Sequence, residues 1–186
     1  MKTAGIIISV LVIESAILIV FVHSGLYNVA ATSPDPKVIR WIFSRTSDNS
    51  VEHHAKGIAV PPLADSSMIQ EGFRHYDEMC VECHGAPGVE RSEIGRGLYP
   101  HGPNLAHSAK ELQPAELFWV IKNGIRSTGM PAFGPTHSDE KIWAMVGFLE
   151  KMKDMNPLEY AAMMKAAPSG KGGDMEDVDM GFHRRK

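Results

Sequence analysis

The longest hydrophobic segment of the chain lies at its N-terminus. Residues 4–22 read AGIIISVLVIESAILIVFV, close to the roughly 20 apolar residues that a helix needs to cross a bilayer. This run is longer than the ~7–15-residue apolar core of a secretory signal, although Val29-Ala30-Ala31 resembles a weak cleavage site. We expect residues 1–24 to form a retained transmembrane anchor, with a cleaved signal as the alternative.

One acidic residue interrupts this apolar run. Glu14 lies near its middle, where a carboxyl group is costly unless it is protonated, paired or facing protein. Our hypothesis is that Glu14 faces a partner subunit. A protonated glutamate in a simple anchor is the alternative.

A second, shorter apolar cluster follows and is mixed with basic residues. Residues 36–43 read PKVIRWIF, which is typical of a short amphipathic helix in the headgroup plane of a membrane. A helix packed on the soluble domain is the alternative. The polar run 45–64 then predicts a tether, in which the adjacent His53 and His54 are expected to be surface residues. We therefore expect residues 25–64 to be an interfacial helix and linker.

Helical periodicity begins near Asp65. Ile69, Phe73 and Tyr76 recur on one helical face, and Ser67-x-x-Gln70 reads as a capping box. This pattern predicts a helix that runs directly into Cys80. Residues 85–113 are rich in glycine and proline. They predict a long loop without helices or strands of its own, which packs around a bound group.

Two further helices follow this loop. The first is expected over 114–123, with Pro114 in its first turn and Asn123-Gly124 at its end. The second is expected to begin at Ser138. Its apolar stripe consists of Ile142, Met145, Val146, Leu149 and Met152. Gly147 within this helix predicts close approach of another helix.

The helical hydrophobic pattern then decays, and residues 154–186 are expected to be a flexible tail, although a short helix is compatible with 157–167.

The 186 residues include 17 glycines and 12 prolines, which favours an all-α fold of short helices joined by loops. The net charge of −3 gives no indication of a nucleic-acid partner.

The segment Cys80-Val81-Glu82-Cys83-His84 carries the clearest chemical signal. It reads C-x-x-C-H, in which two thiols add to the vinyl groups of a haem and the histidine binds the iron. The chain has no other cysteines. A redox C-x-x-C motif is expected near a βαβ pattern, and a zinc site needs further ligands at metal spacing. Neither is visible, so the motif predicts one covalently attached haem c with His84 as an iron ligand.

A second iron ligand is expected downstream. Met130 lies in Gly129-Met130-Pro131 between two predicted helices, where the glycine permits close approach and the proline stiffens the segment. We predict that Met130 binds the iron opposite His84. The competing candidates are Met79, Met145, His101, His107 and His137. The two loop histidines of this group, His101 and His107, are the main rivals.

Residues 65–153 resemble a class I monohaem cytochrome c domain. The resemblance follows the order of a helix with Gly72-Phe73, the Cys80–His84 motif, Gly102-Pro103, the Met130 segment and a last helix with Trp143. It implies a small all-α fold around one covalent haem, here preceded by a transmembrane helix.

The resemblance also implies roles for particular residues. The first and last helices of the domain should cross near Gly72, Phe73 and Trp143. The Pro103 carbonyl should accept a hydrogen bond from the ring of His84, which fixes the imidazole and raises its basicity. Four aromatic residues are expected to bury the haem: Phe73, Phe118, Trp119 and Phe133.

The function that follows is electron transfer rather than catalysis, with no catalytic residue and no small-molecule substrate. We expect a periplasmic cytochrome tethered to the cytoplasmic membrane that exchanges electrons with protein partners, such as a membrane respiratory complex. The basic residues Lys37, Arg40 and Arg45 argue against translocation of this side, but in the resembling family the haem is attached outside the cytoplasm. The alternatives are an integral cytochrome subunit of a larger membrane oxidoreductase, and a haem sensor or enzyme with an open iron site.

Overall fold

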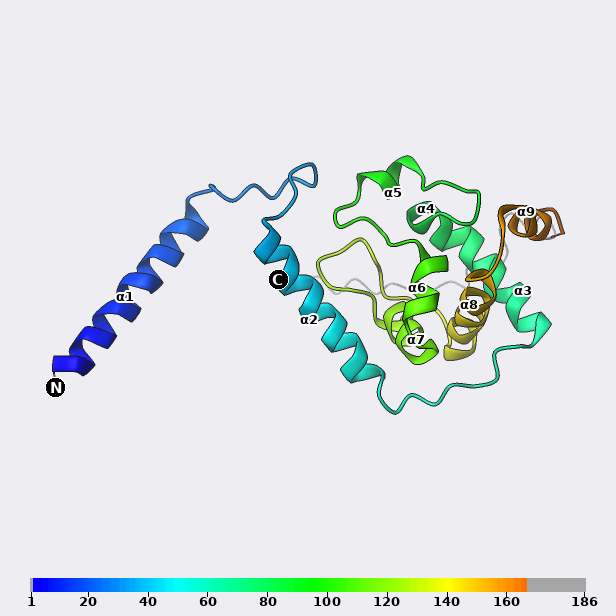
Figure 1. The fold of residues 1–186 in the computed structure, drawn as a ribbon, viewed down its shortest axis with the longest axis horizontal. Coiled ribbons are helices and arrows are strands. Elements are labelled where there is room, and N and C mark those ends of the chain that lie inside the picture. The colour runs from blue at the N-terminus through cyan, green and yellow to red at the C-terminus, as the bar shows by residue number, and fades with distance from the viewer. Residues whose placement is uncertain (1, 167–186) are drawn as a thin grey trace, which may run out of the picture.

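The computed structural model describes residues 2–166, whose regular elements are helices joined by loops (Figure 1). The elements are α1 (Lys2–His23), α2 (Lys37–Ala55), α3 (Ser66–His75), the π-helical turn η1 (Tyr76–Cys80), α4 (Val81–His84), α5 (Glu93–Gly97), α6 (Leu105–Glu111), α7 (Pro114–Asn123), α8 (Asp139–Met152) and α9 (Pro157–Ala166). Between residues 2 and 166 the only β-type pairing is an isolated bridge from Ala86 to Val89. The predicted all-α class is therefore confirmed.

Helix α1 stands apart from the other helices (Figure 1). Among the described residues, Thr3–His23 is the one helix long and apolar enough to cross a membrane, a test that a signal sequence also passes. None of its side chains from Thr3 onward is buried, and Glu14 is exposed with the rest. Its composition supports a single-pass membrane anchor.

Helix α2 is longer than its sequence pattern indicates. The predicted tether is wrong over residues 45–55, because the helix continues to Ala55 and packs against α7. Val51 and Ala55 are buried, and the ring of His54 stacks on Trp119 at a centroid distance of 5.5 Å. The second half of α2 is thus a helix packed on the domain, whereas its first half exposes apolar side chains.

The core forms where α3 crosses α8. A Cβ atom added to Gly72 would overlap the carbonyl oxygen of Ala144, so the two backbones are in direct contact. Phe73 lies edge-on to Phe148 with ring centroids 5.4 Å apart. The aromatic partner on α8 is therefore Phe148, whereas Trp143 stacks on Phe118 of α7 at 4.2 Å.

The beginning and end of α3 differ from the sequence-based prediction. The cap is Asp65, whose carboxylate accepts the N–H groups of Ser67 and Met68 at 3.0 Å, so the Ser67–Gln70 capping box is wrong. The α-helix ends at His75, and the chain then forms the π-turn η1, which leads into the motif. Within that turn Tyr76 is buried, and its hydroxyl donates to the Gly85 carbonyl at 2.5 Å.

Two short helices break the segment that was expected to be a plain loop. Ser92 caps α5 by accepting the Gly95 N–H. The Asn104 side chain caps α6 by accepting the N–H groups of Ala106 and His107. Each helix has too few residues for a hydrophobic period to show in the sequence, but both begin at a good N-cap residue.

Helices α7 and α8 agree closely with their predicted bounds. Pro114 occupies the first turn of α7, and Gly124 follows its end with a φ of +66°. Ser138 caps α8, whose predicted apolar stripe is buried. The close approach of another helix expected at Gly147 is only partly right: the backbone nearest to an added Cβ is the segment leading into α3, with the Leu63 carbonyl oxygen at 3.3 Å, and the Met68 side chain of α3 follows at 3.5 Å.

The flexible tail expected from residue 154 is wrong over residues 157–166, which form α9, the short helix that the sequence allowed at 157–167. Tyr160 is fully buried, lies 5.5 Å from the ring of Phe73, and donates its hydroxyl hydrogen to Asp77 at 3.0 Å. This burial of an aromatic side chain holds α9 on the domain. The rest of the predicted tail, 167–186, lies outside the described residues.

The crossing at Gly72 makes a testable prediction. In the full-length protein, Gly72→Ala is expected to lower the free energy of unfolding by about 1–3 kcal/mol, because the added methyl group must push α3 away from α8. Urea unfolding followed by circular dichroism measures this change. Gly97→Ala is the control, because its added Cβ has no neighbour within 4 Å. An equal effect of the two substitutions would contradict the proposed contact.

Candidate cofactor site

A cavity of about 380 Å³ lies between the C-x-x-C-H motif and the loops around α6 and α7. Cys80, Cys83, His84 and Met130 all line it. Most of its remaining wall is apolar, including Leu98, Leu105, Leu117, Ile121, Phe133 and Leu149. The structure therefore brings the predicted attachment motif and the predicted second ligand to one apolar cavity.

The imidazole of His84 is held in one tautomer. Its Nδ1 lies 2.8 Å from the carbonyl oxygen of Pro103. A carbonyl only accepts hydrogen bonds, so Nδ1 carries the proton and Nε2 presents a lone pair. Burial lowers the pKa of His84 below its ordinary value, against the opposing effect of the Pro103 carbonyl. A neutral imidazole with a free Nε2 is the form that binds a metal.

The two cysteines lie free at the same cavity and are not joined as a disulfide. Burial raises the pKa of the Cys80 thiol to about 12, so this thiol is neutral at physiological pH. Two unpaired thiols, a neutral imidazole and an apolar wall match the chemical requirements of a covalently attached haem. The residues present thus fit the group that the motif predicts.

Glycines allow the neighbouring loops to approach the motif closely. A Cβ added to Gly102 would lie 2.7 Å from the Cys83 carbonyl oxygen and 3.2 Å from Nδ1 of His84. On the other side, the Glu82 carbonyl accepts hydrogen bonds from the backbone and the hydroxyl of Ser92, at 3.0 and 3.1 Å. These contacts fix both the loop that carries Pro103 and the start of α5.

The segment that carries Met130 is ordered by its own hydrogen bonds. The Thr128 hydroxyl donates to the Ile125 carbonyl at 2.7 Å and accepts the Met130 N–H at 3.1 Å. The Ile125 N–H donates in turn to the Met130 carbonyl at 3.2 Å. Gly129 lies against Leu98, whose Cδ1 would be 2.8 Å from an added Cβ. Sequence reasoning missed Thr128, although a threonine two residues before the methionine is a recognisable turn-forming residue.

The rival ligands fall into two groups. Met79 and His101 line the same cavity as Met130. The other three lie elsewhere: Met145 is in the core, His107 is exposed beside Glu111, and His137 packs near His75. Met79 and His101 are therefore the alternatives to Met130 that remain for the second iron ligand.

The four aromatic residues expected around the haem are not all at the cavity. Phe133 lines it. Phe73 and Phe118 instead pack against aromatic residues of α8, and Trp119 packs against His54 of α2. The prediction is therefore wrong for these three, because the helices that carry them turn those side chains toward other helices.

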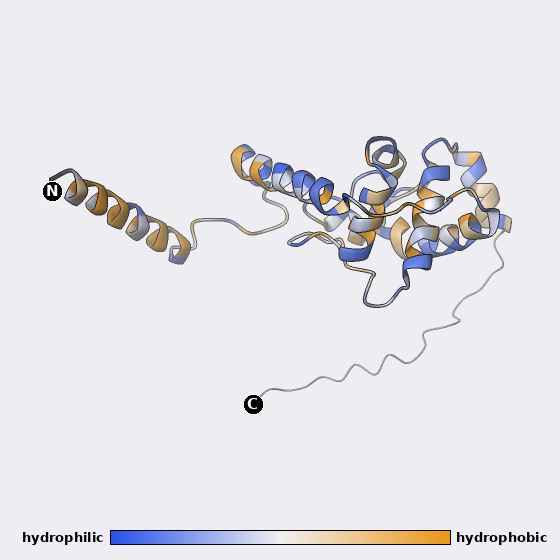
Figure 2. Cartoon of the chain, turned by 90° about the horizontal axis from the view of Figure 1, so that it is seen from below, coloured by the Kyte–Doolittle hydropathy of each residue, from blue (hydrophilic) through white to orange (hydrophobic). Residues whose placement is uncertain are grey.

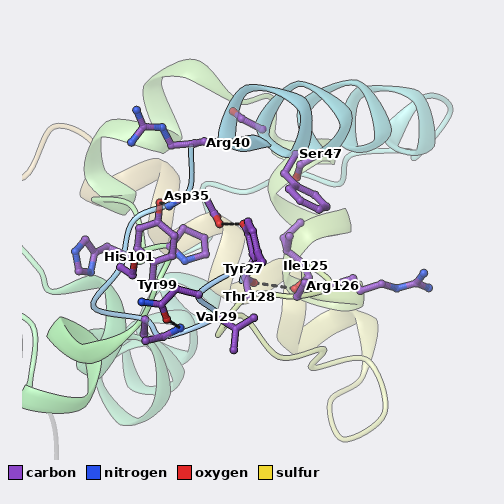
Figure 3. A pocket seen from close by; sticks show the side chains of 18 of the residues that line it. Tyr27, Val29, Asp35, Arg40, Ser47, Tyr99, His101, Ile125, Arg126 and Thr128 are labelled. Carbon is purple, nitrogen blue, oxygen red and sulfur yellow. Dashed lines mark hydrogen bonds between the residues drawn. The ribbon is translucent and has the colours of Figure 1, made fainter. Parts of the chain in front are cut away.

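A second, larger cavity of about 780 Å³ adjoins the first (Figure 3). Its walls come from the segment after α1, from α2 and from two loops of the domain. Tyr27 donates a hydrogen bond to the Asp35 carboxylate, and the Asp35 N–H donates to the Tyr99 hydroxyl at 3.1 Å. Four residues line both cavities: Pro100, His101, Ile125 and Thr128. The chain that leaves α1 therefore packs beside the candidate cofactor site.

The fold and site together define a class I monohaem cytochrome c domain, the class that carries covalently bound haem c and transfers electrons. Residues 67–149 match the family model described as "Cytochrome C oxidase, cbb3-type, subunit III", a domain of this class. The match leaves α1, α2 and α9 outside it. No curated protein matches the chain.

The hydrogen bonds of Thr128 lead to a second prediction. Thr128→Val is expected to destabilise the Met130 segment by about 1–2 kcal/mol, because it leaves the Met130 N–H without a partner and removes one of the two hydrogen bonds that the Ile125 carbonyl accepts. Hydrogen exchange should show faster exchange at the amides of Met130 and Ile125. The control is Thr136→Val, whose exposed hydroxyl donates at 3.3 Å to Phe133. Unchanged exchange at Met130 would contradict the role of Thr128.

Proposed function

We propose that this protein is a membrane-tethered electron-transfer cytochrome with one haem c on the periplasmic side of the cytoplasmic membrane. Cys80 and Cys83 would attach the haem, and His84 and Met130 would supply the two protein ligands of its iron. The observation that carries this proposal is the single apolar cavity lined by all four residues. No catalytic residue is assigned.

When bound, haem c supplies a ferric/ferrous couple that carries one electron at a time. The chain's own residues tune that couple. The Pro103 carbonyl orients the His84 ring and raises the basicity of Nε2. A thioether ligand raises the potential above that of a bis-histidine site. The apolar wall disfavours the extra charge of the ferric state and acts in the same direction.

The N-terminal helix supports the membrane part of the proposal. A tethered domain meets membrane-bound partners at a high effective concentration without any additional contact. The class supports the periplasmic side of the proposal, because its haem is attached outside the cytoplasm. We infer that the redox partners are proteins of a membrane respiratory complex.

A second candidate is that the chain is an integral cytochrome subunit of a larger membrane oxidoreductase. Glu14 favours this candidate, because it is exposed within the apolar helix, where a carboxyl needs a partner. The matched family is itself described as an oxidase subunit.

Glu14 provides the test of this second candidate. Glu14→Leu is expected to reduce several-fold the amount of partner that co-purifies in mild detergent, because it removes a polar contact inside the membrane. Native gel migration and partner yield measure the effect. Ser15→Leu is the neighbouring control on the same exposed helix. An unchanged complex in the Glu14 variant would contradict the role of Glu14, whereas migration of the wild-type protein alone would leave a free tethered carrier as the function.

The ligand assignment is tested first by absorption spectra of the full-length protein, ferric and ferrous, with and without carbon monoxide. We expect a low-spin c-type spectrum with the red-region ferric band of methionine ligation and no response to carbon monoxide. A carbon monoxide-reactive wild-type haem would instead support the sensor or enzyme with an open iron site.

Substitution of the ligand completes that test. Met130→Ala is expected to make the iron reactive to carbon monoxide and to lower the midpoint potential by on the order of 0.1 V, within the ~0.8 V range set by axial ligands. Met79→Ala and His101→Ala are the controls, because both residues line the same cavity. If either control, rather than Met130→Ala, opened the iron, the assignment of Met130 would be wrong.

A further inference from the structure

The first two turns of α2 carry an exposed apolar stripe. Val38, Trp41 and Ile42 are 66, 64 and 45% exposed. Their i, i+3, i+4 spacing places them on one face of the helix. Figure 2 shows this hydrophobic end of α2 beyond the body of the domain, followed by polar turns.

The opposite face of the same helix packs against the domain. Ser44 and Ser47 line the second cavity, and Val51 and Ala55 are buried on the domain side. At 100° per residue, this set lies on the side of the helix away from Val38 and Ile42. The exposed stripe therefore points away from the domain and is not part of its core.

Two basic residues lie beside the stripe: Arg45 shares its face, and Lys37 lies at its edge, whereas Arg40 lines the second cavity on the other side of the helix. Lys37, Arg40 and Arg45 lie in the first half of α2, and residues 37–47 contain no acidic residue. None of the three basic residues forms an ion pair within the part of the chain that the structure describes. An apolar stripe with a tryptophan and flanking cations is complementary to an anionic lipid surface.

The chain also keeps this stripe close to α1. Residues 24–36, thirteen in number, separate the two helices, and an extended chain of that length reaches at most about 45 Å. The hydrogen bonds of Asp35 to Tyr27 and Tyr99 shorten the real distance. If α1 spans a bilayer, α2 is therefore confined to the region near its surface.

We propose that the first two turns of α2 bind the anionic lipid surface of the membrane in which α1 is anchored. Val38, Trp41 and Ile42 enter the apolar boundary, while Lys37 and Arg45 contact lipid phosphates. The inference rests on the proposed membrane tether. Because the other face of α2 holds the domain, lipid binding fixes the orientation of the cofactor cavity as well as its distance from the membrane.

The test uses full-length haem-loaded protein in vesicles of phosphatidylcholine with or without phosphatidylglycerol. With Cys80 and Cys83 consumed by haem attachment, Val38→Cys introduces a single reactive thiol for an environment-sensitive fluorophore. We expect a blue-shifted emission, quenching by doxyl-labelled lipid and protection from acrylamide, all stronger in the phosphatidylglycerol vesicles. Asn49→Cys is the matched control on the same face of α2, and its label should stay accessible to acrylamide.

A third label, at Ile13→Cys, separates this inference from the proposed tether. Lipid quenching at position 13 with full acrylamide quenching at position 38 would overturn the lipid docking and leave the tether intact. A water-accessible label at position 13 would overturn the tether itself. A label at position 38 protected from both quenchers would show a protein partner or a second copy on the stripe, and would also overturn the inference.

Removal of the charges tests the lipid chemistry. Replacing Lys37 or Arg45 with glutamine should lower the docking equilibrium about fivefold per charge in the phosphatidylglycerol vesicles, and should have little effect in pure phosphatidylcholine. Lys56→Gln at the far end of α2 is the control, because Lys56 pairs with Glu52 at 3.4 Å. Equal effects of the three substitutions would contradict binding of anionic lipid at the first two turns.

Discussion

The contact between α3 and α8 at Gly72 is the constraint on which the site depends. Any side chain at this position would occupy the space of the Ala144 carbonyl oxygen, so the absence of one lets the two helices meet backbone to backbone. The direction of α3 is then fixed, and the chain leaves it through η1 directly into Cys80. Leu149, the residue that follows Phe148 on α8, lines the cofactor cavity itself. The contact between α3 and α8 therefore positions both the C-x-x-C-H motif and part of the wall of the cofactor cavity.

Two buried phenols strengthen this support around η1. Tyr76 donates to the Gly85 carbonyl, just after the motif, and Tyr160 of α9 donates to Asp77. Burial raises the pKa of both phenols above the ordinary value. Both hydroxyls therefore remain protonated donors across the physiological range of pH. The π-turn, which lacks the regular hydrogen bonds of an α-helix, is thus tied to the domain from two sides by side chains.

The sequence predicted helix bounds correctly where the hydrophobic periodicity and a capping residue indicate the same end. This holds for α7 and α8, whose bounds follow from Pro114, Gly124 and Ser138. It fails where two residues are equally good caps, as with Asp65 and Ser67, since only packing decides between them. The prediction from sequence fails again in α2. Val51 and Ala55 are the buried hydrophobic residues of segment 45–55, so the segment reads as a polar linker. At the site, residue types predicted the attachment motif and placed Met130 beside it, but the contacts of Gly102 and Thr128 depend on how distant loops meet.

The continuity of α2 changes what the membrane-proximal region does. A flexible tether of the same length would raise the local concentration of the domain and leave its orientation free. A helix of 19 residues extends about 28 Å as a stiff rod, and its last turns are fastened to α7 through Val51 and Ala55. Its middle residues form the wall of a cavity that shares His101 and Thr128 with the cofactor cavity. Whatever orients the first turns of α2 must therefore orient the cofactor cavity, and it also governs which face of the domain a membrane-bound partner meets.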